Sequence, residues 1–348
     1  MQRLELLISK VPQDQLYYIE DPVDLYYLTG LKLSKGRMLV GNKTSLFVDG
    51  RYFFAAKATF PESVEPLEKL ETCILESQRK TLCFDQEKTS YARYMELEKL
   101  TSRGILLKPI ESPLASLRQI KSAQEILLIE KSAAINQQAL QNILPKIAQG
   151  VTEQELAKEF MIQALKLGAE KMAFDPIVAF GENTALAHHR ASARQLRLED
   201  PILIDVGVMY QNYASDITRT FFYKKSSQKL LKLREQVIHL QKKIVAMVRP
   251  GVSIRDLAMY AKNAIENMGP YQFIHSLGHG LGLEVHEMPK FSLQEKEDQK
   301  LQPGMVITIE PGVYIEGLGG FRHEDLLVVT QTGCKNLYEN FAPAMMIE

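Results

Sequence analysis

Acidic side chains interrupt four apolar, strand-like runs in the second half of this 348-residue chain. The runs are PILIDVGVMY, YASDITRTFFY, MVITIEPGVY and GFRHEDLLVVT. A carboxylate buried in such a run needs a partner, or else it stays protonated. The acids are Asp205, Asp216, Glu310 and Glu324, and they are the first candidates for chemistry.

The first two runs are predicted to form a hairpin that turns at Tyr210-Gln211. In that register Asp205 lies directly opposite Asp216. Cross-strand partners hold their Cβ atoms about 5 Å apart on one face, and like charges so placed are destabilising. Such a pair therefore needs a neutralising cation.

The last two runs are predicted to form a second hairpin, centred on Gly317, which places Glu310 directly opposite Glu324. Arginine is the alternative to a metal as neutraliser, and Arg219 and Arg322 lie on the same runs. Arg322 has the parity of Glu324, so it can support the site from the same face. Two acidic pairs in one domain favour metal cations.

Three of the seven histidines, His275, His279 and His286, lie in the segment FIHSLGHGLGLEVHE. His279 stands between Gly278 and Gly280. Flanking glycines let the backbone approach closely, which suits an imidazole presented from a loop to a metal.

One nitrogen and four carboxylate ligands form a hard set, which favours manganese, iron, cobalt or zinc over copper. So many carboxylates require two ions. A water between two such ions loses a proton near neutral pH and becomes a nucleophile. The three cysteines are scattered and lack the spacing of a thiolate zinc site.

The first 110 residues alternate strand-like runs with helix-like segments such as YARYMELEKL. This pattern predicts a compact α/β domain. The strand-like runs are QLYYIE, RMLVG, SLFVD, CILE, TLCFD and ILLKPI.

A capping box of Ser122 and Glu125 opens a long helix that is expected to reach about Leu144. We place an N-terminal domain at residues 1–115 and an α+β catalytic domain at residues 116–348.

The sequence GVTEQELA, beginning at Gly150, recurs as GVSIRDLA, beginning at Gly251. In each copy a glycine precedes a hydroxyl residue that caps a helix, with an acid three places later. Similar helix punctuation alone could give this match, but the shared Val and Leu-Ala favour an internal duplication.

Composition argues against two classes of partner. Lys plus Arg and Asp plus Glu both total 42, so the net charge offers no attraction to nucleic acid. No stretch approaches the roughly 20 apolar residues of a membrane span. We expect a cytoplasmic protein.

The motifs LILIDVG, SDITRT, SLGHGLGLEVHE, IEPGVY and GFRHED together resemble the metallopeptidase family of methionine aminopeptidase, aminopeptidase P and prolidase. The resemblance implies the pita-bread fold with an internal pseudo-twofold duplication. DLYYLTG, LFVDGRY and KSAQEI are similar to the smaller N-terminal domain of creatinase, aminopeptidase P and prolidase, and to its junction.

The resemblance also implies how five side chains would hold two divalent ions. Asp205 would chelate one ion, Asp216 and Glu324 would bridge both, and His279 with Glu310 would hold the other. Manganese is the expected metal, with cobalt or zinc as alternatives.

The remaining roles concern the substrate. Glu310 would shuttle a proton as general base and acid, and Arg322 would orient a ligand carboxylate. His188 and His286 would contact substrate and stabilise the tetrahedral intermediate, and His275 would be a further substrate-side histidine.

Two features depart from the family pattern. Ser192 is followed by Ala193 where the proline peptidases often have Asp, and the chain has no tryptophan. His189 receives no role from the sequence.

The resemblance implies a peptidase that cuts the Xaa-Pro bond of peptides with proline second, in a homodimer. Aminopeptidase P is preferred slightly, with the dipeptide-specific prolidase as the alternative. A creatinase-like amidinohydrolase and a non-catalytic binding protein are the other hypotheses, and five intact metal ligands argue against both.

Overall fold

The structure is a computed structural model, and it describes residues 2–41, 43–60, 62–294, 298–341 and 343–347. The chain forms two compact units, Met1–Leu117 and Arg118–Glu348. The proposed domain boundary after residue 115 stays a prediction. Within the described ranges, no helix has both the length and the apolar composition needed to cross a bilayer.

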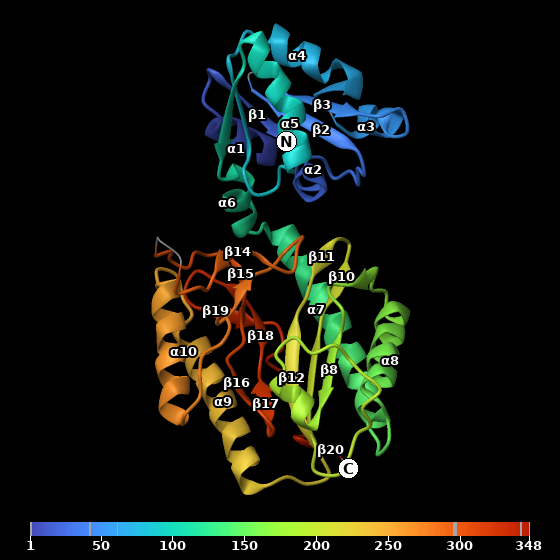
Figure 1. Ribbon diagram of the computed structural model, residues 1–348, viewed down its shortest axis with the longest axis vertical. Helices are drawn as coiled ribbons and strands as arrows, with labels where there is room; N and C mark the ends of the chain where they lie inside the picture. Colours follow the sequence, from blue (N-terminus) through green and yellow to red (C-terminus); the bar gives the residue numbers. More distant parts are fainter. Residues whose placement is uncertain (1, 42, 61, 295–297, 342, 348) are drawn as a thin grey trace. The chain divides into compact units, whose positions relative to one another are not determined.

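The N-terminal unit is built on one six-stranded sheet with the order β4-β3-β2-β1-β5-β6 (Figure 1). The pairs β1–β2 and β2–β3 are antiparallel, and the other three pairs are parallel. This mixed sheet with helices confirms the predicted α/β class. The elements are α1 (Gln2–Lys10), β1 (Gln15–Ile19), α2 (Pro22–Thr29), β2 (Gly36–Val40), β3 (Ser45–Val48), α3 (Phe53–Thr59), β4 (Ser63–Pro66), α4 (Leu70–Glu76), β5 (Thr81–Asp85), α5 (Tyr91–Glu98) and β6 (Leu106–Ile110).

One strand prediction in this unit is wrong. The run CILE, expected as a strand, lies in the helix α4. Of its residues only Ile74 is buried, as expected for one face of a helix rather than a strand in the sheet. Short apolar runs do not distinguish strand from helix by periodicity, and the long side chains around this one favour a helix.

The described residues of the second unit form four long helices and the remaining strands. Figure 1 shows α7 and α8 beside one set of strands and α9 and α10 beside the other. Its elements are α6 (Pro113–Gln119, which begins before the unit boundary), α7 (Ala123–Ile143), α8 (Glu153–Lys166), β7 (Lys171–Met172), β8 (Ile177–Phe180), β9 (Pro201–Val206), β10 (Val208–Tyr210), β11 (Tyr213–Ala214), β12 (Ile217–Tyr223), α9 (Gln228–Met247), α10 (Ile254–Met268), β13 (His279–Gly280), β14 (Glu287–Lys290), β15 (Val306–Ile309), β16 (Gly312–Ile315), β17 (Gly319–Arg322), β18 (Asp325–Val329), β19 (Cys334–Asn336) and β20 (Met346–Ile347).

Two sheets of this unit carry the acidic runs. One has the order β20-β12-β9-β8, and the other has the order β14-β13-β15-β18-β19. A bridge between Thr218 and Glu324 joins the first sheet to the second hairpin. The two sets of acids are therefore brought to one place by a direct backbone contact.

The helix starts are built as the sequence predicts. Ser122 and Glu125 form the capping box of α7. Thr152 caps α8, with Glu155 completing a second box, and Ser253 caps α10 by accepting a hydrogen bond from the amide of Asp256.

The internal duplication is visible in the backbone hydrogen bonds. Gly150 N–H donates to Leu196 O, and Gly251 N–H donates to Leu301 O. Leu196 N–H returns a bond to Val151 O, as Leu301 N–H does to Val252 O. In each half the segment before the helix is thus paired with the strand-like segment that follows it.

The register of the first hairpin differs from the prediction. The turn lies at Gln211-Asn212, both with positive φ, one residue later than expected. Asp205 consequently pairs with Thr218, and Asp216 is two residues away along the strand. Because the shift is two residues, the carboxylates still share one face.

The register of the second hairpin is as predicted. Ile309 pairs with Asp325 in one ladder and Gly312 pairs with Arg322 in the next. Between these ladders, Glu310 and Glu324 occupy opposite positions. Gly317, with φ of 71°, lies in the turn.

Candidate metal centre and active site

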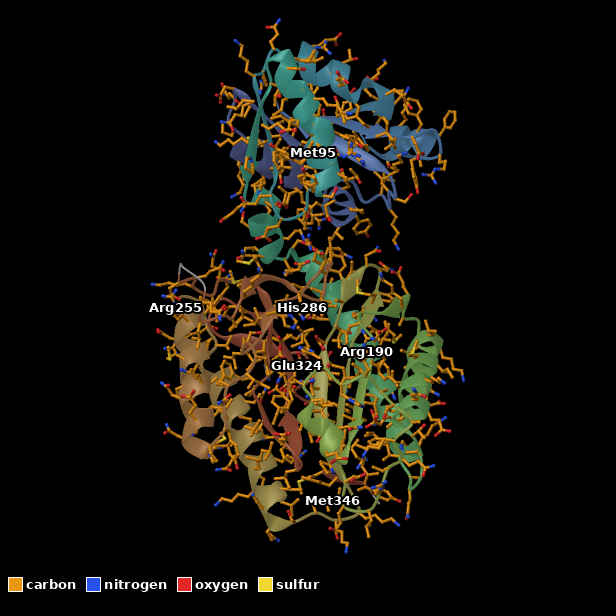
Figure 2. All side chains as sticks on the ribbon, in the orientation of Figure 1. Met95, Arg190, Arg255, His286, Glu324 and Met346 are labelled. Atoms are coloured by element: carbon orange, nitrogen blue, oxygen red, sulfur yellow. The ribbon has the colours of Figure 1, made fainter. Side chains whose placement is uncertain are left out.

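One cavity of about 910 Å³ in the second unit brings the predicted site residues together. Figure 2 shows His286 and Glu324 between α10 on one side and α8 on the other. A cavity of this size suits a small ligand. It is lined by all nine predicted residues, His188, Asp205, Asp216, His275, His279, His286, Glu310, Arg322 and Glu324.

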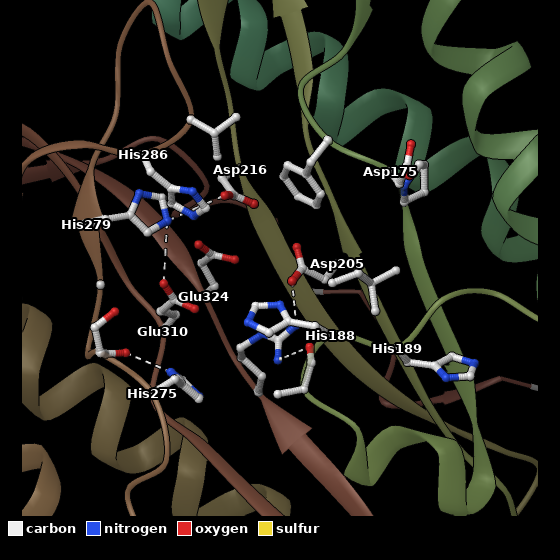
Figure 3. Close-up of a pocket in the computed structure, with 18 of the residues that line it drawn as sticks. Asp175, His188, His189, Asp205, Asp216, His275, His279, His286, Glu310 and Glu324 are labelled. Carbon is white, nitrogen blue, oxygen red and sulfur yellow. Dashed lines mark hydrogen bonds and ion pairs between the residues drawn. The ribbon is translucent and has the colours of Figure 1, made fainter. Parts of the chain in front are cut away.

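The potential metal ligands cluster at its centre (Figure 3). Ligand atoms of Asp216, His279 and Glu324 all lie within 4.8 Å of one another. His279 Nε2 is 3.8 Å from Asp216 Oδ2 and 3.5 Å from Glu310 Oε1. Asp205 lies on β9, on the same face as Asp216.

His279 is held by the close backbone approach that its glycines predict. A Cβ on Gly278 would lie 2.1 Å from Thr308 O, and one on Gly280 would lie 2.1 Å from Met288 O. Any side chain at either position would push β13 away from its neighbours. The prediction of a loop is corrected, because His279 lies in the short strand β13.

The imidazole of His279 is arranged as a neutral ligand. Its Nδ1 lies 3.0 Å from Gly280 O, so Nδ1 carries the proton and Nε2 presents its lone pair. Burial, helped by the neighbouring His286, lowers the pKa of His279 to about 4. Its short contacts to Asp216 and Glu310 are therefore not ion pairs at neutral pH.

The environment of three of the acids disfavours their ionised forms. Burial, followed by the charges of its acidic neighbours, raises the pKa of Asp216 well above its usual range. The same two causes act on Glu324. For Glu310, burial raises the pKa to about 7, against the charge of Arg322.

Two carboxylate oxygens have no donor. Asp205 Oδ1 and Asp216 Oδ1 are buried and accept no hydrogen bond from the described residues. Buried charged oxygens of this kind are satisfied by cations. Together with the neutral nitrogen of His279, they fit a pair of divalent ions.

Two threonines orient the acids. Thr218 Oγ1 donates to Glu324 Oε2 at 2.7 Å, and Thr308 Oγ1 donates to Glu310 Oε1 at 3.4 Å. Thr308 Oγ1 also accepts from the amide of His279 at 3.1 Å. Each threonine leaves the other oxygen of its acid available.

Arg322 supports the site, as its parity predicts, and Arg219 does not enter it. Arg322 Nη2 pairs with Asp205 Oδ2, and Nη1 donates to the hydroxyl of Tyr314. Although burial opposes its charge, Tyr314, Asp205 and Glu310 raise the pKa of Arg322. Arg219 instead pairs with Asp325, 2.7 Å away.

The three histidines that are expected to contact substrate line the same cavity. Figure 3 shows His188 beside Asp205, His286 beside His279, and His275 below Glu310. Burial, with the charge of Arg322, lowers the pKa of His275 to about 4, and burial with His188 lowers that of His286. The single N–H of neutral His275 is directed at Ser276 O, 2.7 Å from Nδ1, whereas the ring of His286 can donate a hydrogen bond to a substrate oxygen.

Sequence reasoning missed Tyr314, which links two of these groups. Its hydroxyl accepts from Arg322 and lies 3.0 Å from His275 Nε2. Burial, opposed by Arg322, raises its pKa to about 12, so it stays protonated. Its signal was available, because Tyr314 has the parity of Glu310 on the same hairpin arm.

Comparison with known proteins defines the class of this chain. Residues 128–331 match the model of metallopeptidase family M24, and residues 9–120 match the creatinase/prolidase N-terminal domain. The chain belongs to family M24 and is a metallopeptidase. The predicted pita-bread fold, preceded by a creatinase-like domain, is confirmed.

Similar proteins with a stated activity fall into two groups. The Xaa-Pro dipeptidase of Pyrococcus furiosus is 36% identical over 97% of both chains. The structure of a Xaa-Pro dipeptidase from Bacillus anthracis superposes with a TM-score of 0.92, at 29% identity over 99% of both chains. The X-Pro aminopeptidase of Thermotoga maritima gives a TM-score of 0.87, at 30% identity and 99% coverage of both.

These relatives support prolidase, the alternative, better than the aminopeptidase P that the sequence analysis preferred. That preference was slight, because the sequence does not resolve how much space the site leaves beyond the prolyl residue.

Proposed function

We propose that this metallopeptidase is a Xaa-Pro dipeptidase, which hydrolyses dipeptides with a C-terminal proline. The observation that carries the proposal is the convergence of three buried carboxylates, the half-buried Glu310 and a neutral histidine in one cavity. The similarity to the P. furiosus dipeptidase, along almost the whole chain, supplies the substrate class.

Asp205, Asp216, His279, Glu310 and Glu324 would hold two divalent ions. Ions at this position supply Lewis acidity to the scissile carbonyl and to the attacking water. Manganese is the first ion to test, because hard oxygen ligands dominate the set. The homodimer and the cytoplasmic location stay predictions.

Glu310 is suited to move the proton. It lies 3.5 Å from His279 Nε2, among the expected metal ligands, where a carboxylate can take a proton from the attacking water and return it to the leaving prolyl nitrogen. Thr308 occupies Oε1, so Oε2 is the oxygen that carries the proton.

His188 and His286 would donate hydrogen bonds to the carbonyl oxygen as it gains charge. His275 stands further out, where Tyr314 fixes its ring. Arg322 is already engaged by Asp205 and Tyr314, so its first effect is on the orientation of Asp205.

A dipeptide brings a free carboxylate to within one residue of the scissile bond. Lys158, Arg190 and Lys290 lie on the cavity wall and take no part in the acid cluster. One of these cations is available to pair with that carboxylate, which a longer peptide does not carry at the same place.

The test compares three substrates that differ in one property each. Purified protein, stripped with a chelator and reloaded with manganese, cobalt or zinc, is assayed with Ala-Pro, Ala-Pro-amide and Ala-Pro-Ala. We expect Ala-Pro to be cleaved fastest, because the amide has its size but lacks its charge.

Faster cleavage of Ala-Pro-Ala would instead identify an aminopeptidase P, the second candidate that the T. maritima structure favours. Absence of cleavage of all three with every metal, in protein shown to be folded by circular dichroism, would contradict both.

A further inference from the structure

Glu153, the first residue of α8, is a buried carboxylate that the metal site does not use. Its side chain has 0% exposure. It accepts five hydrogen bonds, more than any of the metal-site acids receives from side chains or backbone. Oε1 accepts from Phe180 N at 2.8 Å and Asn183 Nδ2 at 2.9 Å, and Oε2 accepts from His189 Nε2 at 2.7 Å, Ser192 N at 2.9 Å and Ser192 Oγ at 2.6 Å.

This carboxylate is not needed to start the helix. Thr152 and Glu155 already form the capping box of α8. In the other half of the duplication the corresponding position is Ile254, whose amide bonds to Gln299 O just as the amide of Glu153 bonds to Arg194 O. Ile254 is buried as well. An apolar side chain therefore fills this position where only packing is required.

The five donors all belong to one short stretch, residues 180–192, that also carries His188. His188 and His189 both line the cavity, and in Figure 3 the ring of His189 points away from the acidic side chains. Glu153 holds His189 on one side of His188, and Arg322 Nη1 donates to Ala187 O, at 3.3 Å, on the other. Both chain neighbours of His188 are thus fixed.

We propose that Glu153 is a positioning residue that acts through His188, holding the segment 180–192, called here the His188 loop, in its productive geometry. The proposal rests on the proposed function, since His188 is the substrate-side group. It also assigns His189 and Ser192 a role as hydrogen-bond donors to Glu153.

The electrostatics agree with this role. Burial alone would raise the pKa of Glu153, but the hydrogen bonds from Ser192, His189, Asn183 and the amide of Phe180 lower it. The side chain is therefore ionised at neutral pH, and a carboxylate can accept all five bonds at once. Ser192 bonds to Glu153 through its own hydroxyl and amide, so the side chain at position 193 takes no part in these hydrogen bonds.

Glu153→Gln tests the proposal, because the amide nitrogen of glutamine cannot accept the hydrogen bonds that one of the two carboxylate oxygens of Glu153 accepts. We expect kcat/KM for Ala-Pro to fall by about tenfold to a hundredfold, the scale of a misplaced catalytic group. Glu155→Gln is the matched control, an exposed acid in the same helical turn, and it should keep the parent value.

A double-mutant cycle separates positioning from general damage. In a His188→Ala background, Glu153→Gln should cause no further loss, and alone it should divide its effect between kcat and KM as His188→Ala does. Both variants should retain the parent metal content. An additive loss in the cycle, or loss of metal, would overturn the proposal.

Two further measurements keep the test decisive. Hydrogen exchange at the amides of Phe180 and Ser192 should accelerate in Glu153→Gln but not in Glu155→Gln, and this readout is independent of activity. If Glu153→Gln does not fold, Ser192→Ala removes one donor and should lower kcat/KM by roughly fivefold. Unchanged exchange or unchanged kinetics contradicts the positioning role, whereas an inactive parent protein contradicts the proposed function.

Discussion

The two halves of the catalytic unit share a backbone plan and differ in the side chains placed on it. In each half, one acid lies near the C-terminal end of a strand or directly after it, and a second acid lies directly before the partner strand. These are Asp205 and Asp216 in the first half and Glu310 and Glu324 in the second. The shared backbone sets the position of each acid, and the side chains set its role.

The halves diverge around these acids. Two residues before Glu324 stands Arg322, whereas two residues before Asp216 stands the buried Ala214. His279 comes only from the second half, and Glu153 with its five hydrogen bonds comes only from the first. A duplicated frame thus carries His279, Arg322 and the hydrogen-bonded Glu153 each in a single copy.

The largest expected effect tests the equivalence of the central acids. Asp216→Asn and Glu324→Gln remove the charge at matched positions with little change in shape. Each should lower kcat/KM by at least about two to three orders of magnitude, as when one transition-state electrostatic contact is lost. Metal content by mass spectrometry should fall in both.

Circular dichroism would verify that both variants fold. If one of them kept full metal content and activity, the two halves would not contribute equally to the centre.

The next effect concerns the arginine that only the second half carries. Arg322→Lys should lower activity about tenfold to a hundredfold, the usual result of losing a group that orients a metal ligand. Lysine keeps the charge but lacks the fork that reaches Asp205 and Tyr314 together.

Steady-state kinetics with Ala-Pro and metal analysis would check this. Activity equal to that of the parent would show that a positive charge at position 322 is enough for catalysis. The difference between Arg322 and Ala214 in hydrogen bonding would then have no effect on activity.

A smaller effect should distinguish the start of α8 from the start of α10 by how its contribution to stability depends on pH. Glu153→Gln should destabilise the protein by about 1–3 kcal/mol near pH 7, because buried donors lose a charged acceptor. Since folding lowers the pKa of Glu153 below 4.5, this contribution is complete above about pH 4.5 and is lost as the pH falls through the folded-state value.

Chemical denaturation of both proteins between about pH 7 and pH 3.5 would measure the difference. Ile254→Val in the other half should cost about 0.5–1.5 kcal/mol, with no pH dependence. A difference for Glu153→Gln that grows in acid would contradict the lowered pKa.

The smallest effect should be the same in both halves. Thr152→Ala and Ser253→Ala each remove the cap of a helix, and each should cost about 1 kcal/mol. Urea denaturation at neutral pH would compare them. A cost found at only one of the two caps would show that the helix starts are alike in hydrogen bonding but not in energy.

The sequence was sufficient where local rules decide the structure. Helix caps at Ser122, Thr152 and Ser253 follow from residue type and spacing, and a glycine-rich turn set the register of the second hairpin. In the first hairpin neither Gln211 nor Asn212 is glycine, so the turn was placed one residue early, and only the period of two kept Asp205 and Asp216 on one face.

Long-range contacts were beyond these rules. Glu153 reads as an ordinary first-turn helix acid, because its donors lie 27 to 39 residues away and are brought to it only by the fold. Tyr314 shared the parity of Glu310, but nothing local showed that its hydroxyl would meet both Arg322 and His275. Arg219 and Arg322 likewise separate only when their partners are known.

The bridge between Thr218 and Glu324 has a consequence for how the protein is made. A ribosome finishes Asp216 about a hundred residues before Glu324, an interval of roughly 5–20 seconds of synthesis. His279 is added about sixty residues into that interval, and Glu310 and Arg322 are added near its end. Until then the first two carboxylates exist without most of the groups that complete their surroundings. In the nascent first half these two carboxylates must therefore be protonated or in contact with water until the C-terminal half emerges and completes the site.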